Sequence, residues 1–330
     1  MTASTGSAAY PSRPAERDAW ILSRRGSQGS SAGRRLVSAN RAYGAFVEDE
    51  LDGDGVVRRV ATILLTNREC PFRCLMCDLW QNTLAETVPA GAIAAQIDAA
   101  LAELPAVDII KLYNSGSFFD PRAIPPRDLP EIAARLRGFR RVIVECHPAF
   151  VGDDVGRFRD ALKGQLEVAM GLETIHPEAL ERLNKRMTLE SYARAADRLR
   201  ELDVGIRAFV LVQPPFLPVA EAADWAVRSA EFAFDHGTGV VSLIPVRASN
   251  GALDALAQQG EFLPPRLATL EDAFDRSLAL GRSRVFADTW DLKRFSTCPA
   301  CFHAREQRLR TMNLTQRLMP RAGCATCHDT

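Results

Sequence analysis

The sequence predicts an α/β fold, in which a largely parallel sheet is covered by helices and curls into a barrel or partial barrel. Short apolar runs rich in β-branched residues alternate with helix-like segments along most of the chain. This alternation is typical of parallel strands that helices bury on both faces. Six or seven such units follow one another, as a barrel or partial barrel requires. A chain of 330 residues has room for one such domain and an appendage.

The elements are expected in the following order. Residues 1–40 are polar, lack an apolar core and are predicted to be a flexible lead-in. Residues 42–66 form two extended runs around a turn at 52–55, and the second run is the first strand of the series. Further strands are expected at 107–113, 140–146, 166–172, 205–212, 239–244 and 283–288, and helices at 89–104, 189–202 and 219–234.

Three cysteines follow the first strand of the series directly, in the stretch TNRECPFRCLMCDLW at 66–80. Disulfides explain Cys70, Cys74 and Cys77 poorly, because three is an odd number and such tight loops strain the bridge. A single tetrahedral metal ion needs a fourth ligand, which is missing locally. Three thiolates on one short loop suit a cluster with one open corner. In β/α barrels the chemistry takes place where these cysteines lie, at the C-terminal ends of the strands.

The spacing Cys-x3-Cys-x2-Cys after a first strand resembles the signature of the radical S-adenosylmethionine (SAM) superfamily. The resemblance implies a partial (β/α) barrel of radical SAM type, with a [4Fe-4S] cluster on Cys70, Cys74 and Cys77 and with SAM on the fourth iron. It also implies reductive cleavage of SAM to a 5′-deoxyadenosyl radical that abstracts hydrogen from a substrate. An electron donor such as a flavodoxin or ferredoxin would then be a partner.

Other strand-end motifs are similar to those of one branch of this superfamily, which contains the archaeosine synthase radical SAM subunit, with the Elp3- and MiaB-like enzymes as more distant relatives. The similarity covers about residues 60–290 and implies a modified tRNA base as substrate. The motifs are NSGSFFDP at 114–121, VECHP at 144–148, MGLET at 170–174, LNKRMT at 183–188 and FVLVQPPF at 209–216.

The resemblance also implies candidate contacts to SAM. The loop at 114–117 corresponds to the one that meets the SAM amino end, although it is also compatible with an ordinary turn. Two carboxylates lie inside apolar runs, where a structural salt bridge is the alternative to cofactor binding. A basic residue at 185 or 186 would pair with the SAM carboxylate, and the planar guanidinium suits this better. The candidates are Met76, Ser115, Gly116, Ser117, Glu145, Glu173 and Arg186.

Two weaker candidates lie nearby. Asn250 and Gly251 follow a strand and are assigned only a weak site role. His147 follows Cys146 at a strand end, but without further ligands it is expected to pack or to contact substrate rather than to bind metal.

The remaining cysteines form two Cys-x2-Cys pairs, which indicate a four-thiolate metal site in a module at 291–330, after the barrel at 41–290. Zinc is the first choice for this site, and a second iron–sulfur cluster is the alternative. Between 293 and 321 seven basic residues face one acidic residue, which fits either a solvated helix face or contact with an RNA backbone. The cysteines are Cys298, Cys301, Cys324 and Cys327, and the basic residues are Lys293, Arg294, Arg305, Arg308, Arg310, Arg317 and Arg321.

Composition narrows the functional classes. The formal net charge is zero, so any contact with nucleic acid must come from a local patch. No apolar run reaches the roughly 20 residues that span a bilayer, and no export signal is visible, so we expect a cytoplasmic protein without a membrane partner. Besides tRNA modification, a radical SAM enzyme for a small molecule or peptide remains open. A non-enzymatic iron–sulfur or zinc protein fits less well, because it would not need a barrel.

Overall fold

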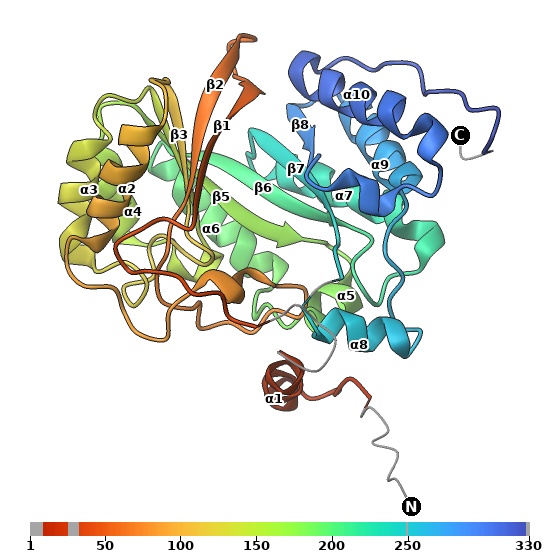
Figure 1. Ribbon diagram of the computed structural model, residues 1–330, viewed down its shortest axis with the longest axis horizontal. Coiled ribbons are helices and arrows are strands. Elements are labelled where there is room, and N and C mark those ends of the chain that lie inside the picture. The colour runs from red at the N-terminus through yellow and green to blue at the C-terminus, as the bar shows by residue number, and fades with distance from the viewer. Residues whose placement is uncertain (1–8, 26–32, 249, 328–330) are drawn as a thin grey trace, which may run out of the picture.

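The computed structural model describes residues 9–25, 33–248 and 250–327. Its strands form one eight-stranded sheet in chain order, in which the first pair is antiparallel and every later pair is parallel (Figure 1). The strands are β1 Gly44–Leu51, β2 Val57–Leu64, β3 Ile109–Tyr113, β4 Arg141–Glu145, β5 Gln165–Glu173, β6 Gly205–Val212, β7 Val240–Pro245 and β8 Arg284–Ala287.

The helices flank the sheet, with α2, α3 and α4 on one side and α7, α9 and α10 on the other (Figure 1). They are α1 Pro14–Arg24, α2 Ala92–Glu103, α3 Leu129–Arg135, α4 Asp153–Ala161, α5 Pro177–Arg182, α6 Leu189–Glu201, α7 Ala222–Asp235, α8 Ala252–Gln258, α9 Leu267–Ala279 and α10 Pro299–Thr315.

The sheet curls but remains open, because the described residues of β1 and β8 are not paired with each other. The architecture is therefore a curled half-barrel, and the predicted partial-barrel fold is confirmed. The main apolar core lies between the sheet and the outer helices and includes Ile63, Leu112 and Val144, all fully buried. No helix in the described part of the chain is both long and apolar enough to cross a bilayer.

The inner face of the sheet carries charged residues toward the N-terminal ends of the parallel strands. Lys111 on β3 bonds to Glu50 on β1 at 2.6 Å, and Arg207 on β6 bonds to Glu50 at 2.5 Å and to Glu167 on β5 at 2.7 Å. Arg207 and Glu167 are almost fully buried, so each charge depends on its partners to offset the loss of hydration. This ion-pair network closes the floor of the half-barrel.

Residues 1–40 are predicted to be a flexible lead-in, but the described part of this segment contains a helix. Residues 14–24 form α1, which begins with Pro14 in the first turn. Trp20 and Ile21 are buried, and Arg17 bonds to both carboxylate oxygens of Glu181. The sequence prediction missed this helix because its few apolar residues stand among polar ones. Residues 1–8 and 26–32, which belong to the same prediction, lie outside the described residues.

The C-terminal segment packs on the half-barrel. Leu309 and Met312 of α10 are fully buried and belong to the main core, and α10 packs against β1 and β8. Figure 1 shows α10 beside β8, at one end of the strand order. Helix α10 of the predicted C-terminal module therefore packs on the half-barrel, and the boundary at residue 291 stays a prediction.

Candidate active site at the cysteine loop

The loop after β2 is tied to other segments by backbone and amide contacts. Leu75 N–H donates to the carbonyl of Leu183 at 2.9 Å. The side-chain amide of Asn250 donates to the carbonyls of Leu75 at 2.7 Å and Cys77 at 3.3 Å. Asn184 donates to the carbonyl of Arg73 at 2.8 Å. These contacts fix the cysteine loop from two other strand-end segments, and they give Asn250 a positioning role.

A second apolar cluster supports the loop from outside the barrel. Leu75, between the second and third cysteines, is fully buried in a cluster that also contains Leu183, Leu253 of α8, and Trp20 and Ile21 of α1. Figure 1 shows α1 and α8 next to each other at this end of the molecule. Met76, the adjacent candidate, is half-buried and packs against the same cluster. The N-terminal helix therefore acts as a support for the cysteine loop, a role that sequence reasoning missed.

The three thiols of the loop fit a cluster rather than a single metal ion. Cys70, Cys74 and Cys77 are free, and each is half-buried. Among the described residues, only the four C-terminal cysteines have sulfurs all within 4.8 Å of one another, so these three sulfurs are spread more widely. Burial raises the pKa of Cys77 to about 12, and also raises that of Cys70, so a bound metal is needed to hold them as thiolates.

The loop after β3 lies against the first cysteine. A side chain on Gly116 would place its Cβ 3.4 Å from Cβ of Cys70, and Ser115 adopts a left-handed φ of 54°. Ser115 shares a hydrogen bond of 2.9 Å with the Tyr43 hydroxyl. Neither amide atom of the buried Asn114 side chain has a hydrogen-bond partner among the described residues. Buried amides are normally paired, so this loop has unused polar groups for a bound ligand.

Glu145, at the end of β4, holds this loop in place. Its Oε1 accepts the backbone N–H of Asn114 at 2.5 Å and that of Gly116 at 3.4 Å. Burial raises the pKa of Glu145 to about 7, although these amides and Lys185 lower it. Its contacts are with the loop, so Glu145 positions the loop residues and its assignment as a cofactor ligand stays a prediction.

A buried ion pair lies at the end of β5. Lys185 Nζ lies 2.5 Å from Glu173 Oε1, and both side chains are at most 10% exposed. Glu173 has a left-handed φ of 66°, a strained conformation that proteins retain mainly at functional sites. A side chain on Gly171 would place its Cβ 2.1 Å from the Glu173 carboxylate and 2.3 Å from the Lys185 amine, so only glycine leaves room for the pair.

The pair faces the cysteine loop. Lys185 lowers the pKa of both Cys70 and Cys74, against the larger effect of burial, which raises it. Arg186, the residue preferred on chemical grounds, points elsewhere: it donates to the carbonyl of Pro14 at 2.8 Å and lies 3.2 Å from Asp18. The structure thus brings Glu173 to the site with Lys185 and not with Arg186.

His147 is part of the packing around the loop. Its ring stacks on Phe72 with centroids 3.9 Å apart, its Nδ1 accepts the N–H of Ala149, and Nε2 lies 3.0 Å from the carbonyl of Lys185. With Nδ1 as acceptor, Nε2 carries the proton and donates to that carbonyl. Burial and Lys185 lower the pKa of His147 to about 3, so the ring is neutral at physiological pH. Ser117 accepts the N–H of His147 at 2.9 Å, which links the loop after β3 to the same network.

Comparison with known proteins agrees with this geometry. Residues 64–224 match the Radical SAM superfamily. This chain contains a radical SAM domain. The matched region begins at the end of β2 and includes the cysteine loop, the loop after β3, Glu145, Glu173 and Lys185. A radical SAM domain makes the protein an SAM-dependent enzyme and implies a [4Fe-4S] cluster and SAM, together with a source of electrons.

Three relatives show how far the similarity extends. An uncharacterized protein of Methanocaldococcus jannaschii is 26% identical over 71% of this chain and 68% of its own length. Archaeosine synthase subunit beta of Methanosarcina acetivorans is 26% identical over 80% of this chain and 81% of its own. The structure of Elp3 from Methanocaldococcus infernus has a TM-score of 0.50 and 13% identity, over 67% of this chain but only 58% of Elp3. This last match supports the fold alone.

A cavity of about 740 Å³ opens inside the half-barrel of this radical SAM enzyme. Ser115 and Glu145 line it at the end where the cysteine loop lies, and Lys111 and Arg207 of the ion-pair network line its floor. Burial raises the pKa of Tyr43 and Tyr113 to about 12, so both phenols in the wall are neutral. The aromatic lining residues are Tyr43, Phe46, Tyr113, Phe209, Phe286 and Trp290.

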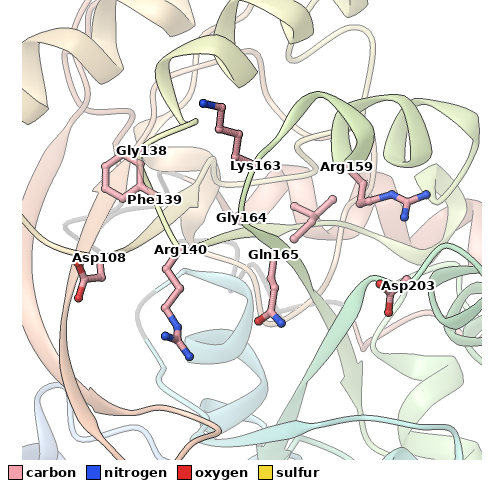
Figure 2. Close-up of a pocket in the computed structure, with 10 residues that line it drawn as sticks. Asp108, Gly138, Phe139, Arg140, Arg159, Lys163, Gly164, Gln165 and Asp203 are labelled. Atoms are coloured by element: carbon pink, nitrogen blue, oxygen red, sulfur yellow. The ribbon is translucent and has the colours of Figure 1, made fainter.

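A second cavity of about 510 Å³ lies at the opposite ends of the strands. Figure 2 shows its lining by Arg140, which precedes β4, by Gln165, which begins β5, and by Asp203, which precedes β6. Arg140 bonds to Asp54 at 3.0 Å, so the charge of this arginine is balanced. This cavity is remote from the cysteine loop, and no thiol is among the described residues that line it.

The four C-terminal cysteines converge, as their spacing predicted. Their sulfurs all lie within 4.8 Å of one another, so the group could hold a metal ion. Cys298 and Cys301 flank the start of α10, whereas Cys324 and Cys327 belong to the segment that returns after it. Hydrogen bonds from the backbone of Cys327 and Thr326 lower the pKa of Cys324 to about 6, which favours the thiolate.

The basic residues of this segment are not the open patch that was expected. Arg305 is 2% exposed and bonds to Glu271 at 2.6 Å, and Arg308 is 5% exposed and bonds to Asp275 at 2.7 Å. The idea that these two arginines contact RNA is therefore wrong, because their charges are used inside the fold. The other five basic residues remain exposed: Lys293, Arg294, Arg310, Arg317 and Arg321.

Proposed function

We propose that the enzyme holds a [4Fe-4S] cluster through Cys70, Cys74 and Cys77 and uses it to modify a base of tRNA. The observation that carries the cluster assignment is the set of three free thiols on one anchored loop, at the C-terminal end of the first parallel strand. Bound there with SAM, such a cluster supplies the electron that yields a 5′-deoxyadenosyl radical for hydrogen abstraction. The protein's part is to fix the thiols, bind SAM and seat the substrate.

The residues around the loop support these roles. Lys185 is the basic group beside the thiols, and with Glu173 it forms a charge pair that would contact the SAM amino acid end. The loop Ser115–Ser117, held by Glu145, would contact the same ligand from β3. Because His147 donates to the carbonyl of Lys185, it orients the segment from which Lys185 projects.

The cavity supports a flat, ring-shaped substrate. Phe209, Phe286 and Trp290 are among its aromatic lining residues, and nucleobases stack well on such side chains. Trp290 is 67% exposed and lies 6.0 Å from Phe46 between ring centroids, so the two rings form an aromatic edge of the cavity. Similarity to archaeosine synthase subunit beta supports a base of tRNA as this substrate.

A small molecule or peptide is the second candidate substrate, and one observation favours it. Arg305 and Arg308, which were expected to meet an RNA backbone, are buried in ion pairs. Of the five exposed basic residues of this segment, Arg294, Arg310 and Arg321 are also in ion pairs. The chain has no net charge to attract a polyanion. A free base or another small ring would need no such charge.

Two further assignments complete the proposal. A ferredoxin or flavodoxin would supply the electron, since the enzyme needs a reductant of low potential. The enzyme would act in the cytoplasm, where reduced thiols remain available for metal binding.

The cluster assignment is tested with anaerobically reconstituted protein. The wild type should bind iron at the loop and release 5′-deoxyadenosine from SAM and dithionite. Changing Cys70, Cys74 and Cys77 together to Ala should abolish this release, whereas Cys146→Ala, which alters a buried thiol outside the loop, should retain it. Undiminished release from the triple variant would refute the assignment. The substrate is tested separately, by mass spectrometry of tRNA nucleosides from a strain that lacks the gene.

A further inference from the structure

The distances between the C-terminal sulfurs distinguish the kinds of metal site. Sγ of Cys298 lies 3.9 Å from that of Cys324, and Sγ of Cys301 lies 3.6 Å from that of Cys327. Four sulfurs at about 2.3 Å from one Zn²⁺ in a tetrahedron are about 3.8 Å apart. A disulfide would need about 2.05 Å. An iron–sulfur cube would bind each thiolate to a different iron and keep the sulfurs farther apart.

The surroundings suit the net negative charge of four thiolates on Zn²⁺. The buried Arg305 bonds to Glu271 and also interacts with the Cys301 thiol. The backbone N–H of Thr326 donates to Cys324 Sγ at 3.4 Å. Donors of this kind orient thiolate ligands and stabilise their charge.

The cysteines join both ends of one structural unit. Cys298 and Cys301 stand at the first turn of α10, and the chain then runs back from Gln316 to Cys324 and Cys327. Along this return segment Arg308 donates to the carbonyls of Met319 at 2.7 Å and Pro320 at 3.0 Å. A metal ion shared by all four cysteines would therefore fasten the return segment to the start of the helix.

Helix α10 closes the open edge of the sheet through side-chain amides. Asn313 accepts the N–H of Ala287 at 2.9 Å and donates to its carbonyl at 2.8 Å. Gln316 does the same for Val285, with both distances 2.7 Å. These two residues of β8 are those whose backbone groups face away from β7, so the amides take the place of a neighbouring strand. Asn313 and Arg310 also line the cavity.

We propose that Cys298, Cys301, Cys324 and Cys327 bind one structural Zn²⁺, and that this ion keeps α10 in place as the closing element of the β8 edge and as one wall of the cavity. This inference does not depend on the identity of the substrate. It also does not depend on the cluster loop, because the two sites use different cysteines.

Metal analysis of the purified wild-type protein tests the ion. After anaerobic reconstitution of the cluster we expect one zinc and about four irons per chain. About eight irons without zinc would mean a second cluster, about five irons without zinc would mean a single iron, and four of the thiols oxidised would mean two disulfides. Each of these three results would overturn the proposal.

Hydrogen exchange tests the role of the ion. Cys324→Ser with Cys327→Ser should remove zinc, retain the iron of the cluster loop, and raise amide exchange at Val285 and Ala287 by about tenfold or more. Ala325→Ser, at an exposed position between the two cysteines, should leave both zinc and exchange unchanged. Asn313→Ala with Gln316→Ala should raise exchange at the same amides but keep zinc. Unchanged exchange in the double cysteine variant, or zinc retained by that variant, would overturn the proposal.

Discussion

Lys185 and Arg186 are neighbours with opposite surroundings, which makes them a matched pair for locating the SAM contact. Lys185 lies beside Glu173 and the thiols, whereas Arg186 lies beside Asp18. We expect Lys185→Met to weaken SAM binding by about tenfold or more, because a charge-assisted hydrogen bond contributes about 1.5–3 kcal/mol. Arg186→Met should change the SAM dissociation constant by about twofold at most, since its exposed ion pair is weak. Equilibrium binding of SAM to the iron-loaded variants is the measurement.

The control for this pair is folding. Lys185→Met leaves the Glu173 carboxylate buried without its partner, which costs about 3–5 kcal/mol of stability. Lys185→Met with Glu173→Gln removes that unpaired charge, so a loss of SAM affinity in the double variant reports on ligand contact. If Arg186→Met alone weakens SAM binding, the original assignment of Arg186 is correct and the contact must form on ligand binding.

Glu145 should make stability depend on pH. Burial raises its pKa from 4.5 to about 7 in the folded protein, so the folded state retains a proton that the unfolded state has lost in this range. Its contribution to the free energy of unfolding is fully present below about pH 4.5 and is lost as the pH rises through 7. Glu145→Gln keeps a carbonyl acceptor for the Asn114 amide but cannot ionise. Urea unfolding of metal-free protein should show a smaller fall in stability from pH 4.5 to 7 in the variant than in the wild type, and parallel curves would contradict the shift.

Spacing alone identified Cys70, Cys74 and Cys77 as one group, because three thiols within eight residues suit neither disulfides nor a single tetrahedral metal ion. The choice between Lys185 and Arg186 could not be made in this way. Both are basic and both lie in the same loop, but left-handed backbone at Asn184 and Arg186 turns Lys185 inward and Arg186 outward. Side-chain direction in an irregular loop depends on such φ values, which no periodic pattern encodes.

At the scale of elements, the pairing of α10 with β8 is open to measurement. Asn313 and Gln316 together make four hydrogen bonds to backbone groups of β8. Each such bond contributes about 0.5–1.5 kcal/mol, so changing both residues to Ala should lower the free energy of unfolding by about 2–6 kcal/mol. Thr311→Ala and Thr315→Ala, which affect hydroxyls bonded only to carbonyls of their own helix, provide the control. A loss no greater than in this control would show that the amides do not stabilise the edge.

The parallel strands were predictable because a short apolar run between two helical segments is seldom anything other than a buried strand. The run expected at 205–212 is β6 to the residue, and that at 166–172 falls within β5. Lys111, Glu167 and Arg207 did not mask these strands, since one polar residue in a run rich in Val, Ile and Leu leaves most of the pattern intact. The sequence did not show that these three charges meet, because their pairing depends on how far the sheet curls.

At the scale of the whole molecule, opposite ends of the half-barrel have different functions. Ion pairs such as Arg207–Glu167 close the floor, while the cysteine loop and the loop after β3 form the reactive end. Two segments far apart in sequence complete the structure: α1 supports the cysteine loop through Trp20 and Ile21, and α10 covers the β8 edge. Such long-range packing could not be predicted from composition, because both segments are largely polar and bury only a few apolar residues.

The response to salt discriminates between the two proposed substrates. Each phosphate that a protein cation neutralises makes log K fall by about 0.7–0.9 per unit of log salt concentration, so tRNA bound through several cations should lose affinity steeply.

Arg305 and Arg308 are paired inside the fold, so we expect Arg310→Ala and Lys293→Ala, which remove exposed cations, to make this slope less steep by about one each. Glu306→Gln, which frees Arg310 from its ion pair, should not reduce the slope. Fluorescence anisotropy of labelled tRNA between low and physiological salt gives the slope directly. A nearly flat response in the wild type would exclude a polyanion held by these residues and favour a small ring-shaped molecule, which would occupy the same aromatic cavity without any contact to phosphate.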